Sequence, residues 1–406
     1  MTDSRLAGAD FVRATACLMV VGTHVAQRVM PGLLPHWGAT TAAAVMMGAF
    51  GVGAFFVLSG YLLARPFWMA LDRGEAMPSL RTYALRRAAR ILPGFWLALT
   101  VTFVLSFTLL RFPFDGELLF RYISGVALVA DFHWLTWFPV EYNGPLWSIG
   151  CEITSYALLP ICLALLFMLP GRTRVWGGRL VWVVLIAGVI GLQWLMVKYL
   201  QPDSYHRDWG FGLVGGAKVW WPAYNPIGFY GLFAIGALAA GFQVRLVKWR
   251  SIVFDIVAIG GAALAVWSMA DNFPYTDGYG LNSIPYGFPW FPIGVALILM
   301  SVPSSLLVRR LTEIAPIAFV ARISFGIYVW HFLLMEIVRV LWQPRYVYGG
   351  MYAVPQWAWI SAGVVVASFV IATLSYYLLE APVIRWARGF EDRPGAGSPT
   401  LSPAAG

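Results

Sequence analysis

Charged residues are scarce in this sequence of 406 residues. Asp, Glu, Lys and Arg together make up 12% of the chain, whereas a soluble globular protein has about 25%. Hydrophobic residues make up 60%, and the mean hydropathy is +0.71. Because too few polar groups remain to cover a water-facing surface, the composition excludes a soluble domain and indicates a chain solvated by lipid.

Cysteine is also rare, and the positions of the cysteines exclude two kinds of site. Cys17, Cys151 and Cys162 all lie inside apolar runs, and no CxxC pair or Cys/His metal spacing occurs. We therefore expect neither a disulfide framework nor a bound metal. The net charge of +9 does not indicate a nucleic-acid partner, because the arginines cluster in short segments between apolar runs.

Apolar runs of about 20 residues, the length that crosses the hydrocarbon core, recur along the whole chain. They predict an all-α, multi-pass protein of the cell membrane with about ten transmembrane helices, surrounded by membrane lipid. The segment 119–135 is shorter and contains Arg121, Asp131 and His133, so we expect it to be interfacial or re-entrant. The predicted spans are 9–28, 43–64, 90–110, 145–169, 180–198, 226–243, 252–270, 289–307, 316–341 and 356–379.

Basic residues are distributed unevenly between the two sets of connecting segments. Arg and Lys cluster at 81–90, 245–250 and 309–322, whereas 271–288 contains neither. By the positive-inside rule the basic segments are cytoplasmic, which places both termini in the cytoplasm. We expect one transmembrane domain over residues 1–386 and a disordered tail rich in Pro, Gly and Ser over 387–406.

Ionisable residues within the predicted spans are unfavourable in lipid and are therefore candidates for function. The first span contains Arg13 near its cytoplasmic end and His24 in its outer half. Glu152 in the fourth span and His331 in the ninth fall at depths comparable to that of His24. Three such groups at one level predict a shared polar cavity, in which Glu152 orients His24 as the general base for a hydroxyl acceptor. The alternative is a polar network that only orders helix packing.

A second cluster of charge precedes the third span. Arg86 and Arg90 are four residues apart and share one face if this segment is helical. Guanidinium groups bind phosphates through paired hydrogen bonds, so these side chains are candidates for binding an anionic ligand. Anchoring of the helix at the cytoplasmic surface is the alternative explanation.

Six motifs, in the same order along the chain, resemble those of the membrane-bound acyltransferase-3 family. Family members often carry a second acidic residue after the motif glutamate, where this chain has Ile153. The six motifs are Arg13-x10-His24, Phe55-Phe-Val-Leu-Ser59-Gly60-Tyr61-Leu, Arg86-x3-Arg90-Ile-Leu-Pro93, Gly144-Pro-Leu-Trp147-Ser-Ile-Gly-Cys-Glu152, Ile323-Ser-Phe-Gly-Ile-Tyr328-Val-Trp-His331 and Leu378-Leu-Glu380-Ala-Pro382.

The resemblance implies an integral membrane O-acyltransferase without a tightly bound cofactor. It implies acyl-CoA as the cytoplasmic acyl donor, a co-substrate whose phosphates bind at Arg86, Arg90 and Arg13. The acceptor that it implies is a hydroxyl of a carbohydrate, a glycan or a secondary metabolite. On the same basis, the set of substrate-binding residues includes Trp147, Tyr328 and His331.

A transporter or flippase is the main alternative to the enzyme. About ten helices with interior charges also suit translocation. Many transporters contain repeated halves with broken helices, and we find no internal repeat in this chain, which favours the enzyme. In a third alternative, a scaffold or sensor, His24 has no catalytic role.

Overall fold

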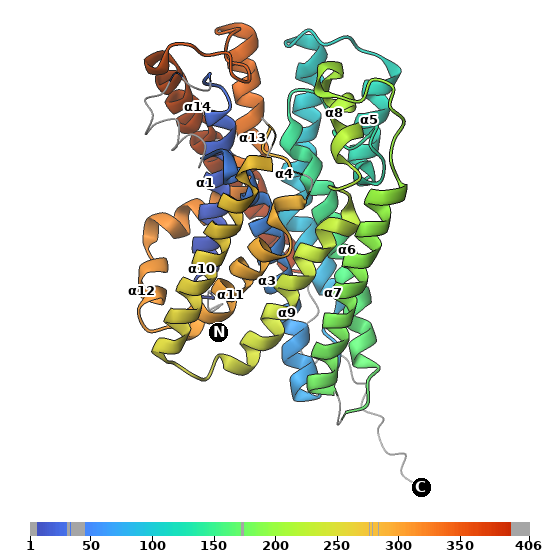
Figure 1. Ribbon diagram of the computed structural model, residues 1–406, viewed down its shortest axis with the longest axis vertical. Coiled ribbons are helices and arrows are strands. Elements are labelled where there is room, and N and C mark those ends of the chain that lie inside the picture. Colours follow the sequence, from blue (N-terminus) through green and yellow to red (C-terminus); the bar gives the residue numbers. More distant parts are fainter. Residues whose placement is uncertain are drawn as a thin grey trace.

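The computed structural model describes residues 6–30, 33, 45–171, 174–275, 277, 279–282 and 284–390, and within these residues the chain is a bundle of helices without a strand (Figure 1). Nine of the described helices are long and apolar enough to cross a membrane. They run over Ala9–Ala26, Met47–Arg73, Leu80–Thr108, Gly144–Phe167, Arg174–Tyr199, Pro226–Leu246, Ile252–Tyr275, Ala315–Leu341 and Val354–Arg388.

A shorter apolar helix over Trp290–Ser304 falls within the predicted span 289–307. Together with the nine long helices it accounts for every predicted span, which confirms an all-α, multi-pass membrane protein. The largest difference lies at the third span, predicted over 90–110, because helix α4 (Leu80–Thr108) begins ten residues earlier. The Ser79 side chain caps this helix by accepting a hydrogen bond from the backbone N–H of Thr82. The arginine-rich segment is therefore the first part of the membrane helix.

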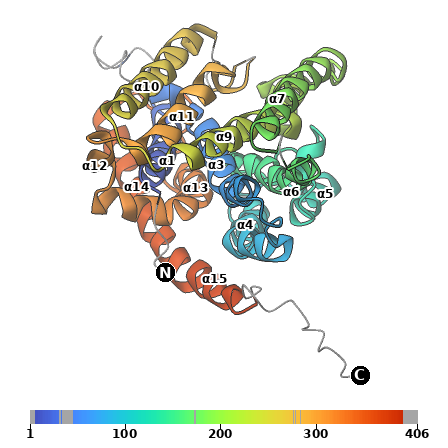
Figure 2. The same cartoon turned by 90° about the horizontal axis from the view of Figure 1, so that it is seen from below.

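Helices α3 (Gly51–Arg73) and α9 (Pro226–Leu246) cross at the centre of the bundle with their backbones in contact (Figure 2). A Cβ atom at Gly60 would lie 1.9 Å from the carbonyl oxygen of Phe233, and one at Gly236 would lie 1.9 Å from that of Val57. Only glycine permits this approach. Two small residues on facing helices thus set the spacing of the bundle core.

Helices α1 (Ala9–Ala26) and α13 (Ala315–Leu341) pack beside α3 and contribute the remaining central positions. Outside them, α7 (Arg174–Tyr199), α10 (Ile252–Asn272) and α14 (Val354–Ser375) expose large apolar side chains to the surroundings. Exposed aliphatic residues on the perimeter match a surface that lipid covers.

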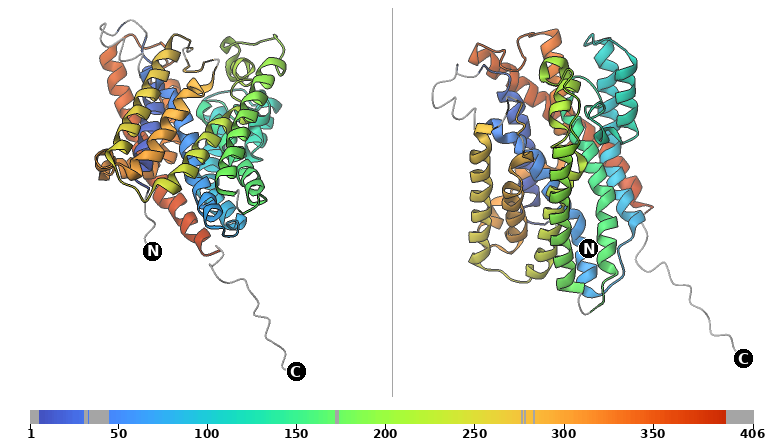
Figure 3. Two further views of the ribbon diagram at one scale, coloured as in Figure 1. Left: turned by 60° about the horizontal axis from the view of Figure 1, so that its bottom comes forward. Right: turned by 45° about the vertical axis from the view of Figure 1, so that its right-hand side comes forward.

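Two short helices, α5 (Gly116–Val126) and α8 (Gly212–Trp220), lie at one end of the bundle, and α15 (Ala381–Arg388) ends at the other, where α1 begins (Figures 1 and 3). The 11 residues of α5 reach about 16 Å, which is too short to span. The prediction that 119–135 is not a span is confirmed. The predicted tail disorder concerns mainly residues 391–406, which lie outside the described residues. The assignment of the termini to the cytoplasm stays a prediction.

Candidate functional site

The imidazoles of His24 and His331 are in direct contact between α1 and α13. His24 Nδ1 lies 2.8 Å from His331 Nε2, and the ring planes are nearly parallel, at 16°, with their centroids 5.1 Å apart. On its other side, His331 Nδ1 lies 2.8 Å from the carbonyl oxygen of Tyr328 and 3.0 Å from that of Ile327. His331 is fully buried, whereas His24 is partly exposed and borders a cavity.

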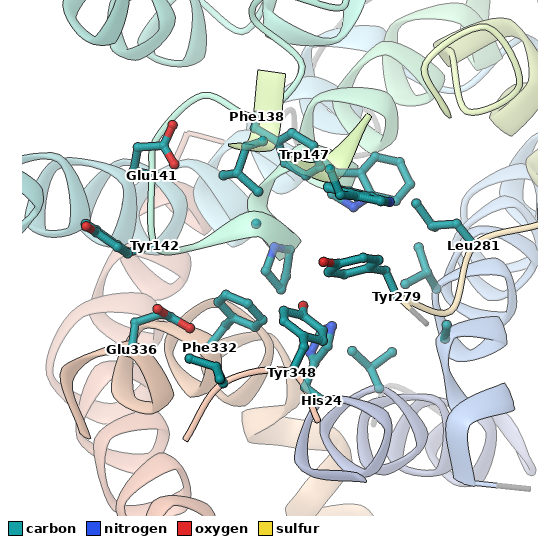
Figure 4. A pocket seen from close by; sticks show the side chains of 18 of the residues that line it. His24, Phe138, Glu141, Tyr142, Trp147, Tyr279, Leu281, Phe332, Glu336 and Tyr348 are labelled. Atoms are coloured by element: carbon teal, nitrogen blue, oxygen red, sulfur yellow. The ribbon is translucent and has the colours of Figure 1, made fainter. Parts of the chain in front are cut away.

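This cavity has a volume of about 340 Å³ and lies at the end of the bundle that the charge distribution predicts to be outside. We call it the outer cavity. In Figure 4, His24 lies on one side of it, with Phe138 and Trp147 on the opposite side. Nine aromatic residues line it: Phe138, Tyr142, Trp147, Trp209, Tyr279, Tyr286, Tyr328, Phe332 and Tyr348.

Two tyrosines that loops contribute to the outer cavity, Tyr279 and Tyr348, have neutral hydroxyl groups at physiological pH. Burial raises the pKa of Tyr348, and burial together with the nearby Asp277 carboxyl raises that of Tyr279. Each therefore offers both a hydrogen-bond donor and an acceptor to a ligand in the cavity.

The positive and negative side chains that line the outer cavity pair with groups of opposite charge. Arg28, which is 1% exposed, lies 2.8 Å from Glu336, and Arg339 pairs with the same carboxylate. Glu141 on the opposite wall pairs with the buried Arg121. Two arginines and two glutamates border the cavity, so its lining carries no net charge.

A second, smaller cavity of about 90 Å³ lies toward the end where α1 begins, and we call it the inner cavity. Three guanidinium groups line it, from Arg13, Arg87 and Arg90. Glu152 lies among them and accepts hydrogen bonds from the hydroxyls of Ser59, at 2.9 Å, and Tyr156. The inner cavity thus combines a cationic mouth with one partly buried carboxyl.

The predicted ionisable groups therefore divide between two cavities. His24 and His331 meet as expected, but Glu152 on α6 (Trp147–Phe167) lines the inner cavity, and the structure describes no hydrogen bond between it and His24. Depth along a helix axis, from which the shared cavity was predicted, contains no information about the direction in which a side chain points. His331 occupies the place next to His24 that the sequence assigned to Glu152. A catalytic role for Glu152 stays a prediction.

The arginine pair at the inner cavity differs by one residue from the predicted pair. Arg87 and Arg90 line it, whereas Arg86 is exposed and lines neither cavity. Residues three and four apart both share a helix face, so spacing alone could not choose between Arg86 and Arg87 as the neighbour of Arg90. Arg90 also pairs with the buried Glu380 at 3.6 Å.

Tyr328 and Val52 form the wall between the two cavities, because each lines both of them. The Tyr328 hydroxyl lies 2.6 Å from Ser148 Oγ and donates to the carbonyl oxygen of Pro145 at 3.0 Å. Among the predicted binding residues, Trp147 lines the outer cavity and Tyr328 both. Sequence reasoning missed Arg28, although it lies one helical turn beyond His24, which was a usable signal.

Comparison with known proteins relates this chain to acyltransferases. The sequence profile of the acyltransferase-3 family, an acyltransferase domain, matches residues 6–377. Peptidoglycan O-acetyltransferase OatA of Listeria monocytogenes is 23% identical over 85% of this chain and 54% of its own length. O-acetyltransferase OatA of Staphylococcus aureus is 23% identical over 95% and 58%.

The relatives differ in how much of their length this chain covers. It spans little more than half of the OatA proteins, but 92% of acyltransferase MdmB of Streptomyces mycarofaciens, which is 24% identical over 94% of this chain. No solved structure matches the chain significantly.

Proposed function

Because the chain belongs to the acyltransferase-3 family, we propose that it transfers an acyl group from acyl-CoA to a hydroxyl group, with His24 as the general base. The observation that carries this proposal is an imidazole at the edge of a cavity rich in aromatic side chains, held by a 2.8 Å hydrogen bond to His331. An alcohol is a weak nucleophile while protonated, so a positioned base is what its acylation needs. The acceptor oxygen attacks the thioester carbonyl while its proton goes to His24. The carbon–sulfur bond then breaks, and the leaving thiolate takes this proton from His24, so that CoA departs as the thiol and His24 is neutral again.

The inner cavity is the proposed donor site. Arg13, Arg87 and Arg90 offer guanidinium groups suited to the phosphates of CoA. A volume of about 90 Å³ is too small for the whole of acyl-CoA. The phosphates would therefore remain at the mouth of the cavity while the arm that carries the acyl group enters it. To reach His24, the thioester must then pass the wall of Tyr328 and Val52.

The outer cavity is the proposed acceptor site, and its lining favours an uncharged, hydroxyl-rich ligand. Aromatic faces stack on the apolar face of a sugar ring, and the carboxylates of Glu141 and Glu336 can accept hydrogen bonds from hydroxyls. Each arginine of the lining already pairs with a carboxylate, which gives an anionic acceptor no unmatched cation. A neutral saccharide or glycosylated metabolite fits these features.

The test is transfer by the purified protein in proteoliposomes. Radiolabelled acetyl-CoA and other acyl-CoA donors are supplied with neutral and acidic saccharide acceptors, and ester formation and CoA release are measured together. We expect stoichiometric release of CoA with a neutral acceptor. Passage of the acceptor across the bilayer without covalent change, and without CoA release, would overturn the proposal in favour of a flippase.

A further inference from the structure

We propose that His331 is a positioning residue that holds His24 in the tautomer with Nδ1 protonated and Nε2 free to accept a proton. The inference rests on the proposed role of His24 as a base and adds what prepares it for that role. It starts from the hydrogen bonds of the two rings and their burial.

The direction of the hydrogen bonds follows from the backbone partners of His331. The carbonyl oxygens of Tyr328 and Ile327 only accept, so His331 Nδ1, at 2.8 and 3.0 Å from them, must carry a proton. In a neutral ring the other nitrogen, Nε2, is then an acceptor. His24 Nδ1 lies 2.8 Å from this acceptor and therefore donates to it. The proton of a neutral His24 is thereby held at Nδ1, which leaves the lone pair on Nε2.

The opposite arrangement requires a cationic His331. If His24 Nδ1 were the acceptor, both nitrogens of His331 would be protonated in a ring that is fully buried. A buried charge without a partner is strongly unfavourable. The cation Arg28 lies near the pair, and its carboxylate partner Glu336 is bonded to Arg28 and Arg339 rather than to either imidazole. A neutral His331 avoids this cost.

The hydrogen bond between the two histidines also stabilises His24 during proton transfer. When the acceptor hydroxyl transfers its proton to His24 Nε2, the resulting imidazolium still donates from Nδ1 to His331 Nε2, and this bond strengthens because its donor is now charged. The Nδ1 proton of His331 stays on that nitrogen throughout and is donated to the carbonyl oxygens of Tyr328 and Ile327. The Phe332 ring packs against His24 at a steep angle, with a centroid distance of 5.0 Å, and restricts rotation of the imidazole. His331 thus acts as a neutral counterpart of the carboxylate in a catalytic triad.

The tautomer is measured directly by nitrogen NMR on protein labelled with ¹⁵N-histidine in nanodiscs. The His24 signals are identified by their absence in His24→Gln. We expect a protonated Nδ1 and an unprotonated Nε2 in neutral His24, the opposite of the form that free histidine prefers in water. A protonated Nε2 in the wild-type protein would overturn the inference, whatever the activity.

Two substitutions separate positioning from packing. His331→Leu cannot accept a hydrogen bond, so we expect kcat to fall at least about 10²-fold with an unchanged KM for the donor, because a base in the wrong tautomer is ineffective. His331→Gln offers an amide oxygen to His24 Nδ1 and should restore kcat to within about tenfold of wild type. The matched control is His206→Leu, which removes an exposed histidine of the loop before α8 and should leave kcat unchanged.

Each result has a distinct meaning. Equal losses in His331→Leu and His331→Gln, with both proteins folded, would contradict the positioning role. Wild-type kcat in folded His331→Leu would contradict it as well. Full transfer by His24→Gln would instead overturn the proposed role of His24 as the general base, and the NMR measurement on the wild-type protein would still decide the tautomer.

Discussion

His24 is the residue on which the proposed chemistry depends most directly. Loss of a positioned general base lowers rates by about 10²–10⁴-fold. We therefore expect His24→Ala and His24→Gln both to lose measurable transfer, because glutamine keeps hydrogen-bonding capacity but cannot take up the proton. The measurement is acyl transfer per folded protein in nanodiscs, with folding checked by gel filtration. Near-normal activity in His24→Gln would assign the residue to helix packing instead.

The arginines of α4 provide a second test at single residues, with a matched control one position away. Arg87 and Arg90 line the inner cavity, and Arg86, in the same segment, is exposed. A hydrogen bond to a charged group contributes roughly 1.5–3 kcal/mol. Arg87→Ala and Arg90→Ala should thus raise the apparent KM for acyl-CoA about ten- to a hundredfold, while Arg86→Ala changes it little. Donor titrations with the three variants test this, and an equal effect of all three would indicate general cytoplasmic anchoring.

At the scale of elements, the crossing of α3 and α9 limits what the bundle tolerates. A Cβ at Gly60 would lie 1.9 Å from a backbone oxygen of α9, which no side-chain rearrangement can relieve. We expect Gly60→Ala to separate the helices and to lower the free energy of unfolding by at least about 1–3 kcal/mol, the usual effect of overpacking. Thermal unfolding in detergent should show a lower Tm. Gly188→Ala on α7, where a Cβ meets nothing within 4 Å, is the control; equal Tm values for both would contradict the packing argument.

The two cavities are also a consequence of how elements meet. α1 and α13 bring the histidines together, and the same two helices line the inner cavity with α3, α4 and α6. Tyr328 lies on α13 three residues before His331, so one helix contributes both the wall between the cavities and the partner of His24. A displacement of α13 would therefore change donor access and base orientation together.

At the scale of the whole molecule, the predicted orientation in the membrane can be tested by cysteine labelling. In a background with Cys162→Ser, which leaves only the buried Cys17 and Cys151, single cysteines are introduced at exposed positions. Lys248→Cys should react with an impermeant maleimide only from the cytoplasm, and Tyr275→Cys, at a side chain that is 73% exposed, only from outside. Labelling of Tyr275→Cys from the cytoplasm would reverse the topology and exchange the sides of the two cavities.

The lipid-embedded, all-helical nature of this chain could be predicted from its amino-acid sequence. Hydrophobicity over about 20 residues and the arginines beside it are local properties, so the spans, the short α5 and the membership of a family of acyltransferases could be predicted. Single residues at known depths, such as His24 and Glu152, were also identifiable as candidates.

Which of these candidates contact one another became known from the packing of the helices. The partner of a side chain depends on the rotation of each helix about its axis and on the crossing of helices far apart in sequence, and no local pattern contains either. His24 therefore contacts His331, 307 residues away, while Glu152 points to Ser59 and Tyr156. For the same reason Arg87 rather than Arg86 faces the inner cavity beside Arg90, because a rotation of a fraction of a turn separates the buried side of α4 from its exposed side.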